Sequence, residues 1–158
     1  MSEPRIYLNL KRDHDLHRDL LKRIGESRNG EREPLFEQLR LEIAAHAAAE
    51  EESLYATMLA NPDLRGGARH SVAEHKEVAD DLAALSRLEV GTPDWDAKFA
   101  HLRHRYEHHI DEEEEEMFPA AEELLPERVE EELADTYAER KPAELERAME
   151  SPDEDERD

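Results

Sequence analysis

The chain has 158 residues and carries 43 acidic against 21 basic side chains, which gives a formal net charge of −22. A field of this sign repels nucleic-acid phosphates and anionic membrane surfaces, so neither is expected as a partner. The absence of cysteine excludes a disulfide framework and a thiolate-bound metal, so any metal must be held by nitrogen and oxygen atoms. No apolar run is long enough for a signal sequence or a membrane span, which predicts a cytoplasmic protein.

Four long segments are predicted to be helices, because the sparse glycine and proline residues fall between them. These segments are rich in Leu, Ala, Glu and Arg and show no alternation of apolar and polar positions; they span residues 5–24, 34–60, 67–89 and 93–118. Four helices joined by short connections predict an all-α fold, an up-down antiparallel four-helix bundle. We expect this bundle to occupy residues 1–126.

After the bundle the apolar pattern becomes sparse. Apolar side chains recur every four residues, at Val129, Leu133 and Tyr137. This spacing predicts a short helical extension, which we assign to residues 127–150. The acidic tail, residues 151–158, is predicted to be disordered. Because residues 141–158 carry no inward-facing histidine, we expect them to be dispensable for any metal site.

The second and fourth predicted helices carry matching inward stripes. At 100° per residue, each stripe lies within one arc of its helix, and the two stripes align at a constant offset of 63 residues: Phe36, Leu39, Ile43, His46, Glu50 and Leu54 against Phe99, Leu102, Tyr106, His109, Glu113 and Met117. The first and third helices match in the same way, with His14 and His75 at an offset of 61. The bundle is therefore interpreted as a duplicated helix hairpin.

A histidine followed four residues later by glutamate places two potential metal ligands on one helix face. This spacing occurs four times, at His46, His70, His108 and His109. Only His46 with Glu50 and His109 with Glu113 fall on the inward stripes. His70 and His108 are predicted to face solvent or a seam between helices, and His104 with His108 is interpreted as a solvated outer pair.

Four histidines and two glutamates therefore project into one core: His14, His46, Glu50, His75, His109 and Glu113. Two unpaired buried carboxylates would be very costly, so the arrangement requires compensating cations. Two bridging carboxylates with two imidazoles for each ion would satisfy a dinuclear metal centre, a kind of site that helical bundles build. The acidic run from Asp111 to Glu116, apart from Glu113, is interpreted as a solvated face.

Two further inward residues leave alternatives open. His17 faces the core, but the matching position in the repeat is Val78, so His17 is either a core histidine or an additional ligand. Tyr106 lies one turn before His109, where it either packs in the core or acts beside the metals.

At this point the chain resembles the hemerythrin-like, or HHE cation-binding, family. The resemblance rests on RDH ending at His14, HAAAEEESLY from His46, AEH ending at His75 and HIDEEEEEMFP from His109, and it covers about residues 5–125. It implies an up-down four-helix bundle with a non-haem centre of two iron ions, bridged by carboxylates and by an oxo or hydroxo group. The implied ligands are the same six residues, although zinc or manganese would also suit nitrogen and oxygen donors.

One departure from the family bears on function. Oxygen-carrying hemerythrins place another histidine four residues after the third-helix ligand, and this chain has Ala79 at that position. They also have a His-x4-Asp motif on the last helix, whereas in this chain Glu113 follows His109 at the shorter HxxxE spacing. The small Ala79 side chain is expected to leave an open position at the metals. We therefore expect a catalase-like or peroxidase-like enzyme with Tyr106 as its catalytic side chain and hydrogen peroxide or a small diatomic molecule as substrate.

Two other functions remain as alternatives to a peroxide-reactive enzyme. The first is a non-catalytic binder or sensor of oxygen, nitric oxide or iron, which would use the same metal centre without turnover. The second is an acidic helical interaction module with no chemistry. The inward register of six potential ligands disfavours the second alternative, and the missing carrier histidine disfavours reversible oxygen carriage.

Overall fold

The structure is a computed structural model that describes residues 3–150, so the predicted disordered tail at 151–158 lies outside the described residues. The described chain consists of helices and short connecting loops, with no strand, which confirms the all-α prediction. Its elements are α1 (Arg5–Glu26), α2 (Asn29–Glu50), η1 (Glu51–Tyr55), α3 (Ala56–Ala60), α4 (Arg65–Arg87), α5 (Pro93–Glu112), η2 (Glu113–Met117), α6 (Phe118–Leu124) and α7 (Glu127–Glu150). Within residues 3–150, no helix is both long enough and apolar enough to cross a membrane.

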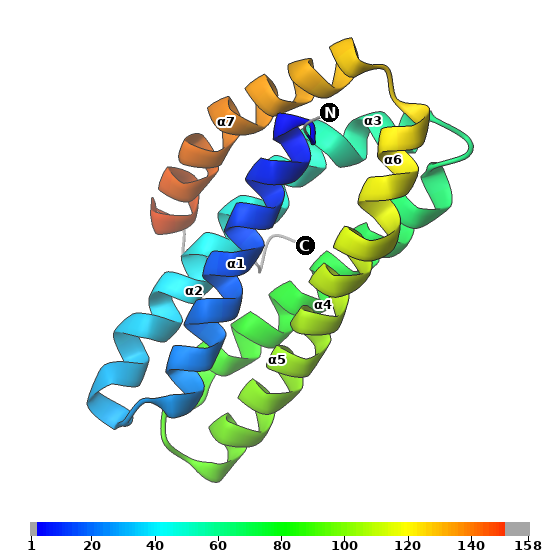
Figure 1. Cartoon of the computed structure of the whole chain (residues 1–158). Coiled ribbons are helices and arrows are strands. Elements are labelled where there is room, and N and C mark those ends of the chain that lie inside the picture. The colour runs from blue at the N-terminus through cyan, green and yellow to red at the C-terminus, as the bar shows by residue number, and fades with distance from the viewer. Residues whose placement is uncertain (1–2, 151–158) are drawn as a thin grey trace.

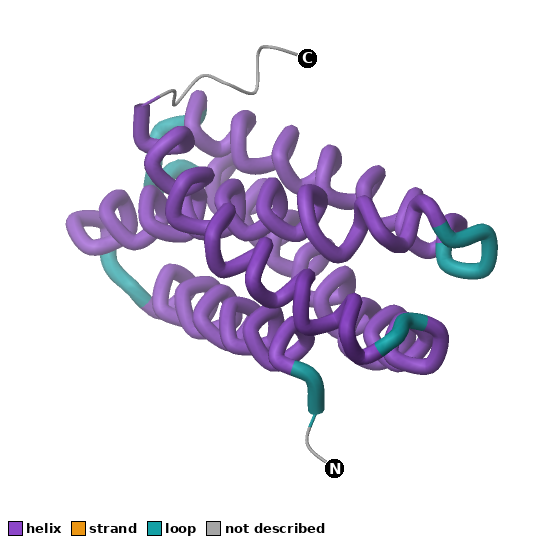
Figure 2. The backbone as a smooth tube through the Cα atoms, turned by 90° about the horizontal axis from the view of Figure 1, so that it is seen from above, coloured by secondary structure: helices purple, strands orange, loops and turns teal. Residues whose placement is uncertain are grey.

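Two helix pairs build the centre of the molecule. α1 packs against α2, and α4 packs against α5 (Figure 1). The loops lie at the ends of the helices, so the long helical runs pass one another over most of their length (Figure 2). Local signals explain where α5 starts: the Thr92 side chain accepts a hydrogen bond from the Trp95 backbone N–H at 3.3 Å, and Pro93 occupies the first turn.

The second and fourth predicted helices each contain a turn of π-helix. η1 follows directly after Glu50, and η2 begins at Glu113, so each wide turn lies at the glutamate of an inward HxxxE motif. The sequence pattern predicted uninterrupted α-helices here, because a single wide turn hardly disturbs the apolar periodicity. π-Turns inside α-helices are frequent at functional sites, where the extra residue redirects the side chains that follow it.

α7 has the bounds of the predicted extension, residues 127–150, but it is a long helix rather than a short one. It has 24 residues, is as long as the bundle helices and includes Pro142 without ending there. It lies beside α1 and α2, with α2 as its main partner (Figure 1). Leu133, Ala134 and Tyr137 are buried on its inner face. The described chain therefore has five long helical runs rather than four and a short piece.

The apolar core is split into two parts along the helices. One cluster includes Tyr7, Leu54 and Phe118, near the start of α1 and the ends of the second and fourth runs. The other includes Ile24, Phe36 and Trp95, near the opposite ends of the same helices. A layer of buried histidine and glutamate side chains lies between the two clusters along the helices.

Candidate metal centre

The structure brings all six predicted ligands into the buried polar layer. The most exposed of them, His75, is only 7% exposed. Their positions are His14 on α1, His46 and Glu50 on α2, His75 on α4, His109 on α5, and Glu113 at the start of η2. Each hairpin of the duplicated sequence thus supplies two histidines and one glutamate to the same layer.

The imidazole rings form two pairs. The ring centres of His14 and His46 lie 5.0 Å apart, and those of His75 and His109 also lie 5.0 Å apart. The first pair comes from α1 and α2, and the second comes from α4 and α5. The layer therefore has two similar halves, as the sequence repeat predicted.

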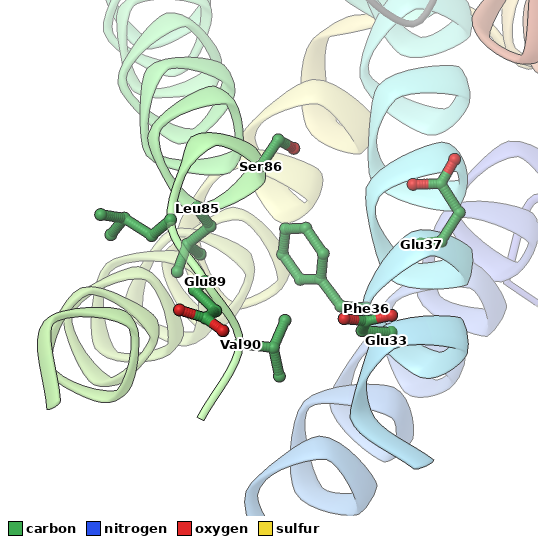
Figure 3. A pocket seen from close by; sticks show the side chains of 8 residues that line it. Glu33, Phe36, Glu37, Leu85, Ser86, Glu89 and Val90 are labelled. Atoms are coloured by element: carbon green, nitrogen blue, oxygen red, sulfur yellow. The ribbon is translucent and has the colours of Figure 1, made fainter. Parts of the chain in front are cut away.

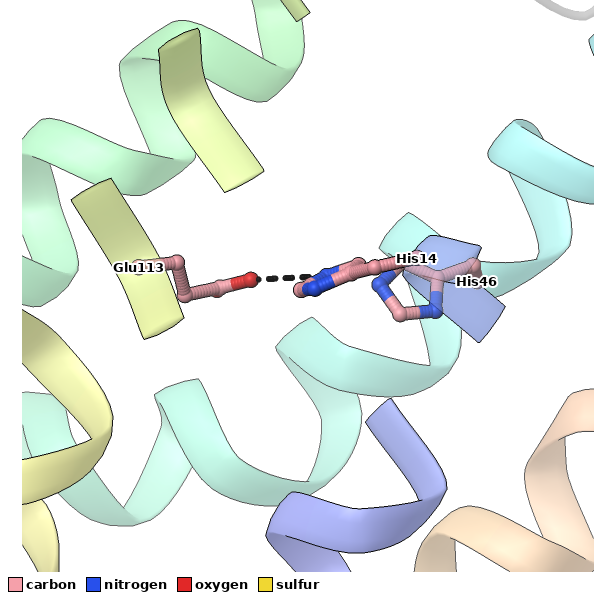
Figure 4. A group of neighbouring side chains, drawn as sticks. All are labelled: His14, His46 and Glu113. Atoms are coloured by element: carbon pink, nitrogen blue, oxygen red, sulfur yellow. Dashed lines mark ion pairs between the residues drawn. The ribbon is translucent and has the colours of Figure 1, made fainter. Parts of the chain in front are cut away.

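The two glutamates lie between these imidazole pairs. Glu50 Oε1 is 3.5 Å from His46 Nε2 and 3.4 Å from His75 Nε2, so one carboxylate oxygen approaches both halves. Glu113 Oε1 lies 3.0 Å from His14 Nε2, as Figure 4 shows with His46 beside them. Burial and the charge of Glu50 raise the pKa of Glu113 above its ordinary value. Burial also acts to raise the pKa of Glu50, but the neighbouring Glu113, His46 and His75 side chains outweigh it and leave that pKa well below its ordinary value.

Several atoms that face the centre lack any hydrogen-bond partner. These atoms are the Nε2 atoms of His14, His17 and His46, both carboxylate oxygens of Glu50, and Glu113 Oε1. The approach of His14 Nε2 to Glu113 Oε1 is an ion-pair contact without hydrogen-bond geometry, so neither atom is satisfied by it. Unpartnered polar atoms are rare in protein interiors and costly. Their chemistry, imidazole nitrogen and carboxylate oxygen, fits cation ligation.

The outward-facing nitrogens of the four rings are all held by acidic side chains. The Nδ1 contacts are His14 to Glu114 at 2.7 Å, His46 to Asp13 at 3.0 Å, His75 to Glu51 at 2.7 Å, and His109 to Glu74 at 2.7 Å. An ionised carboxylate can only accept a hydrogen bond, so each Nδ1 carries the proton. In a neutral ring the Nε2 lone pair is then free to face the centre, as in the carboxylate–histidine–metal arrangements of metalloproteins.

These acidic partners follow a regular pattern in the sequence. Asp13 and Glu74 directly precede the ligands His14 and His75, and each holds the other histidine of its own hairpin. Glu51 and Glu114 directly follow the ligands Glu50 and Glu113, and each holds a histidine of the opposite hairpin. An acidic residue beside each of these four ligands was therefore a signal that the sequence interpretation did not use.

The interpretation of the acidic run as a solvated face is wrong for Glu114. Its carboxylate holds His14 and also accepts hydrogen bonds from the Arg18 guanidinium at 3.1 and 3.3 Å. Burial acts to raise the pKa of Glu114, but His14 and Arg18 lower it overall. Glu115 and Glu116, the next residues in the run, are exposed as expected.

The surrounding carboxylates stabilise two of the imidazoles in their protonated form. Burial lowers the pKa of His14, but Glu113 and Glu114 outweigh it and raise the pKa to about 9. Burial likewise lowers the pKa of His75, while Glu50 and Glu51 raise it to about 10. Without metal, these two protons partly compensate the buried glutamates.

His17 is an additional inward imidazole. It is fully buried on α1, and its ring lies 5.1 Å from that of His46. Its Nδ1 atom is 2.7 Å from the hydroxyl oxygen of Tyr106, which is buried on α5. A hydroxyl both donates and accepts, so Tyr106 does not determine the tautomer of His17, unlike the carboxylates on the other four rings.

Two tyrosines that the sequence interpretation did not assign to the site also contact it. The Tyr55 hydroxyl, at the end of η1, donates to the Glu113 carboxylate. The Tyr137 hydroxyl, on α7, donates to Asp13 and lies 2.7 Å from His46 Nδ1. Lys141 Nζ is 3.0 Å from the same Asp13 carboxylate. Lys141, the first residue of the range 141–158 that is expected to be dispensable for the metal site, therefore contacts the side chain that holds His46, and the dispensability of that range stays a prediction.

The structure also corrects the role expected for Ala79. Ala79 is exposed on α4, whereas its neighbour Val78 is buried and packs in the core. The small side chain of Ala79 therefore leaves no open space at the centre. His17 and Tyr106 occupy the interior near His46 and His109 instead, with Tyr106 and His109 ring centres 6.1 Å apart.

A surface pocket of about 370 Å³ lies between the start of α2 and the end of α4 (Figure 3). It is lined by Glu33, Phe36, Glu37, Leu85, Ser86, Leu88, Glu89 and Val90. None of the six predicted ligands lines it. The candidate site is therefore the buried polar layer and not this pocket.

Comparisons with known proteins show the family of the chain. The family model for the hemerythrin HHE cation-binding domain matches residues 5–121, and the chain belongs to that family. Rv2633c of Mycobacterium tuberculosis and Mb2666c of Mycobacterium bovis are each 32% identical over 113 residues, which cover 70% of this chain and 68% of theirs. A similar fold is found in the crystal structure of an Rv2633c homologue from Mycobacterium kansasii, which is described as a hemerythrin HHE cation-binding domain-containing protein. The TM-score is 0.79 and the sequence identity is 29%, and the match covers 92% of this chain and 90% of that chain. The chain is thus a hemerythrin-like cation-binding protein.

Proposed function

We propose that the buried layer holds two iron ions through His14, His46, Glu50, His75, His109 and Glu113. The observation that carries the proposal is the set of unpartnered imidazole nitrogens and carboxylate oxygens at the centre of the layer. Burying these atoms without partners is costly, and bound cations would remove that cost. In this proposal, α1, α2, α4 and α5 form the up-down four-helix bundle of the family, and α7 is an added fifth helix.

The division of the layer into two halves supports two ions rather than one. Each half contributes an imidazole pair, and Glu50 Oε1 lies at similar distances from Nε2 atoms of both halves, 3.5 and 3.4 Å. A carboxylate in that position suits a bridging role. Glu113 is its counterpart in the sequence repeat, and it lies near enough to Glu50 for the charge of Glu50 to raise its pKa, so it would suit a second bridge.

We further propose that the protein decomposes hydrogen peroxide. In the overall reaction one peroxide is oxidised to oxygen and a second is reduced to water, so that two H₂O₂ yield two H₂O and one O₂. A bound pair of iron ions would supply the electron exchange and the Lewis acidity. The side chains must then exclude bulk water and move the protons that the two half-reactions release and consume.

His17 and Tyr106 are suited to move these protons. Burial and the nearby positive charges of His46 and His14 lower the pKa of His17 well below its ordinary value, so the ring is neutral at neutral pH. Burial and the charges of Glu50 and Glu113 raise the pKa of Tyr106 well above its ordinary value, so the hydroxyl keeps its proton. A neutral imidazole can accept a proton at Nε2 from the peroxide that is oxidised, while its Nδ1–H donates to the Tyr106 hydroxyl oxygen 2.7 Å away, and it can return that proton at Nε2 to the peroxide that is reduced.

Metal analysis of purified protein tests the first part of the proposal. We expect close to two irons for each chain in the wild type and loss of most metal in His46→Ala and in Glu113→Ala. His104→Ala is the matched control, because His104 is an exposed histidine on the same helix as His109. Equal metal loss in the control, or no metal in the wild type, would overturn the site assignment.

Peroxide consumption and oxygen release by the metal-loaded protein test the second part. Catalytic turnover with one O₂ released for every two H₂O₂ consumed supports the proposed reaction. A stable, reversible oxygenated optical spectrum with negligible peroxide consumption would refute it and would favour a non-catalytic binder or sensor. In that case the metal assignment would still stand on the metal analysis.

A further inference from the structure

Two HxxxE motifs of the chain supply no ligand to the buried centre. They are His70 with Glu74 on α4 and His108 with Glu112 on α5. In the folded chain these motifs face one another across the seam between the two helices. His70 Nε2 lies 3.3 Å from Glu74 Oε2 on its own helix and 3.2 Å from Glu112 Oε1 on the neighbouring helix. His108 Nε2 lies 3.8 Å from the other oxygen of Glu112.

These distances match the edges of a metal coordination polyhedron. A tetrahedral ion with ligand bonds of about 2.1 Å holds its ligand atoms roughly 3.4 Å apart. The nitrogen of His70 and one oxygen each from Glu74 and Glu112 all lie within 4.8 Å of one another. The Glu112 carboxylate also connects His70 to His108, which provides a second imidazole on the opposite side of the seam.

The seam is open to solvent, unlike the buried centre. The His70 and His108 side chains are 58% and 67% exposed, so a cation can reach both rings from solution. The Glu74 side chain is more enclosed, at 13% exposed. The net charge of −22 also raises the local concentration of cations around the chain.

We propose that His70, Glu74 and Glu112, with His108 as a fourth ligand, form an outer binding site for a divalent transition-metal cation. Two imidazoles and two carboxylates are a ligand set that suits Zn²⁺ and, with less selectivity, Mn²⁺ or Fe²⁺. The site is separate from the buried ligands but is joined to them through Glu74. One oxygen of Glu74 faces His70, and the other holds His109 Nδ1 at 2.7 Å.

Zinc stoichiometry of the full chain, with its buried metals in place, tests this site. The wild type, the double variant His70→Ala/His108→Ala and the control His104→Ala are dialysed against Zn²⁺, and bound metals are counted. We expect the double variant to bind one zinc fewer than the wild type and the control to match the wild type. Glu74 is left unchanged because its substitution would also disturb His109. Equal zinc counts in all three proteins would overturn the proposal.

A measurement on the unmutated chain locates the ion. Diethyl pyrocarbonate modifies exposed imidazoles, and mass spectrometry of peptides reports the modification of each histidine. Saturating Zn²⁺ is expected to protect His70 and His108 and to leave His104, one helical turn before His108, as reactive as before. Modification of all three at the same rate with and without Zn²⁺ would show that the seam holds only imidazole–carboxylate ion pairs, and would refute the site.

Discussion

The hydroxyl oxygen of Tyr137, on α7, lies 2.7 Å from Nδ1 of His46, on α2, and the same hydroxyl donates to Asp13 of α1. Lys141 lies one helical turn further along α7 and contacts Asp13 as well, at 3.0 Å. The C-terminal helix therefore supports the outer side of one imidazole pair. In the proposed metal centre it would orient the His46 ring, because hydrogen bonds at Nδ1 determine the direction of Nε2.

Replacement of Tyr137 by phenylalanine removes only this hydroxyl. We expect Tyr137→Phe to lower the free energy of unfolding by about 1–3 kcal/mol, because Asp13 loses a buried donor, and to weaken metal binding by about 10-fold or more. Thermal unfolding and metal competition with a chelator measure the two effects.

Tyr7→Phe is the matched control for this variant. Tyr7 is another buried tyrosine of the α1–α7 contact, and its hydroxyl donates to Glu130 at 2.7 Å, away from the predicted ligands. It should lose a comparable amount of stability and keep its metal affinity. If Tyr137→Phe binds metal as tightly as Tyr7→Phe, the hydroxyl has only a structural role.

Glu114 provides a test of the acidic partners. We expect Glu114→Gln to weaken metal binding by about 10-fold to 100-fold, because His14 loses the charged acceptor that orients it. Glu115→Gln removes the same charge from the adjacent, exposed position and should change little. Equal losses in both variants would mean that general charge, rather than the contact with His14, controls affinity.

The pKa values of His14 and His75 predict proton release on metal binding. Both are raised in the folded chain, to about 9 and about 10, above the ordinary histidine value of 6.5. Their contribution to the stability of the metal-free protein is therefore complete below about pH 6.5 and is lost as pH rises through 9 to 10. Metal ligation requires neutral imidazoles, so binding near pH 7.5 should displace the protons of both rings.

Calorimetric titration in buffers of different ionisation enthalpy counts these protons. We expect about two protons released for each metal-loaded chain near pH 7.5 and fewer as the pH approaches 10. The apparent metal affinity should rise over the same interval. Metal binding that is independent of pH, with no proton release, would contradict the protonated state assigned to the two histidines.

Tyr106 tests the proposed proton transfer. Tyr106→Phe removes the group that faces His17 Nδ1 and leaves the six proposed ligands in place. We expect full metal content with peroxide turnover reduced by about 100-fold or more, the range typical of general acid–base catalysis. A variant with wild-type turnover and an unchanged pH profile would assign Tyr106 to core packing.

The sequence by itself predicted the helices and the residues that face inward. Both follow from the 3.6-residue period, and the repeat at an offset of 63 residues aligns His46 with His109 and Glu50 with Glu113. The same register predicted that His109 faces inward and that its neighbour His108 faces outward, and His108 is exposed. The inward direction of a side chain is a local property of its helix, so one sequence was sufficient for these predictions.

The surroundings of the ligands were decided only by the tertiary structure. Tyr137 and Asp13 are 124 residues apart in sequence, and their contact depends on how α7 packs on α1 and α2. The same holds for Glu114 and His14, which are 100 residues apart. Helical periodicity determines which face of a helix is buried, but it contains no information about which other helix covers that face or at what height. The hydrogen bonds that orient the imidazoles depend on which helix covers the face and on its height, and both are determined by the packing of the five long helical runs.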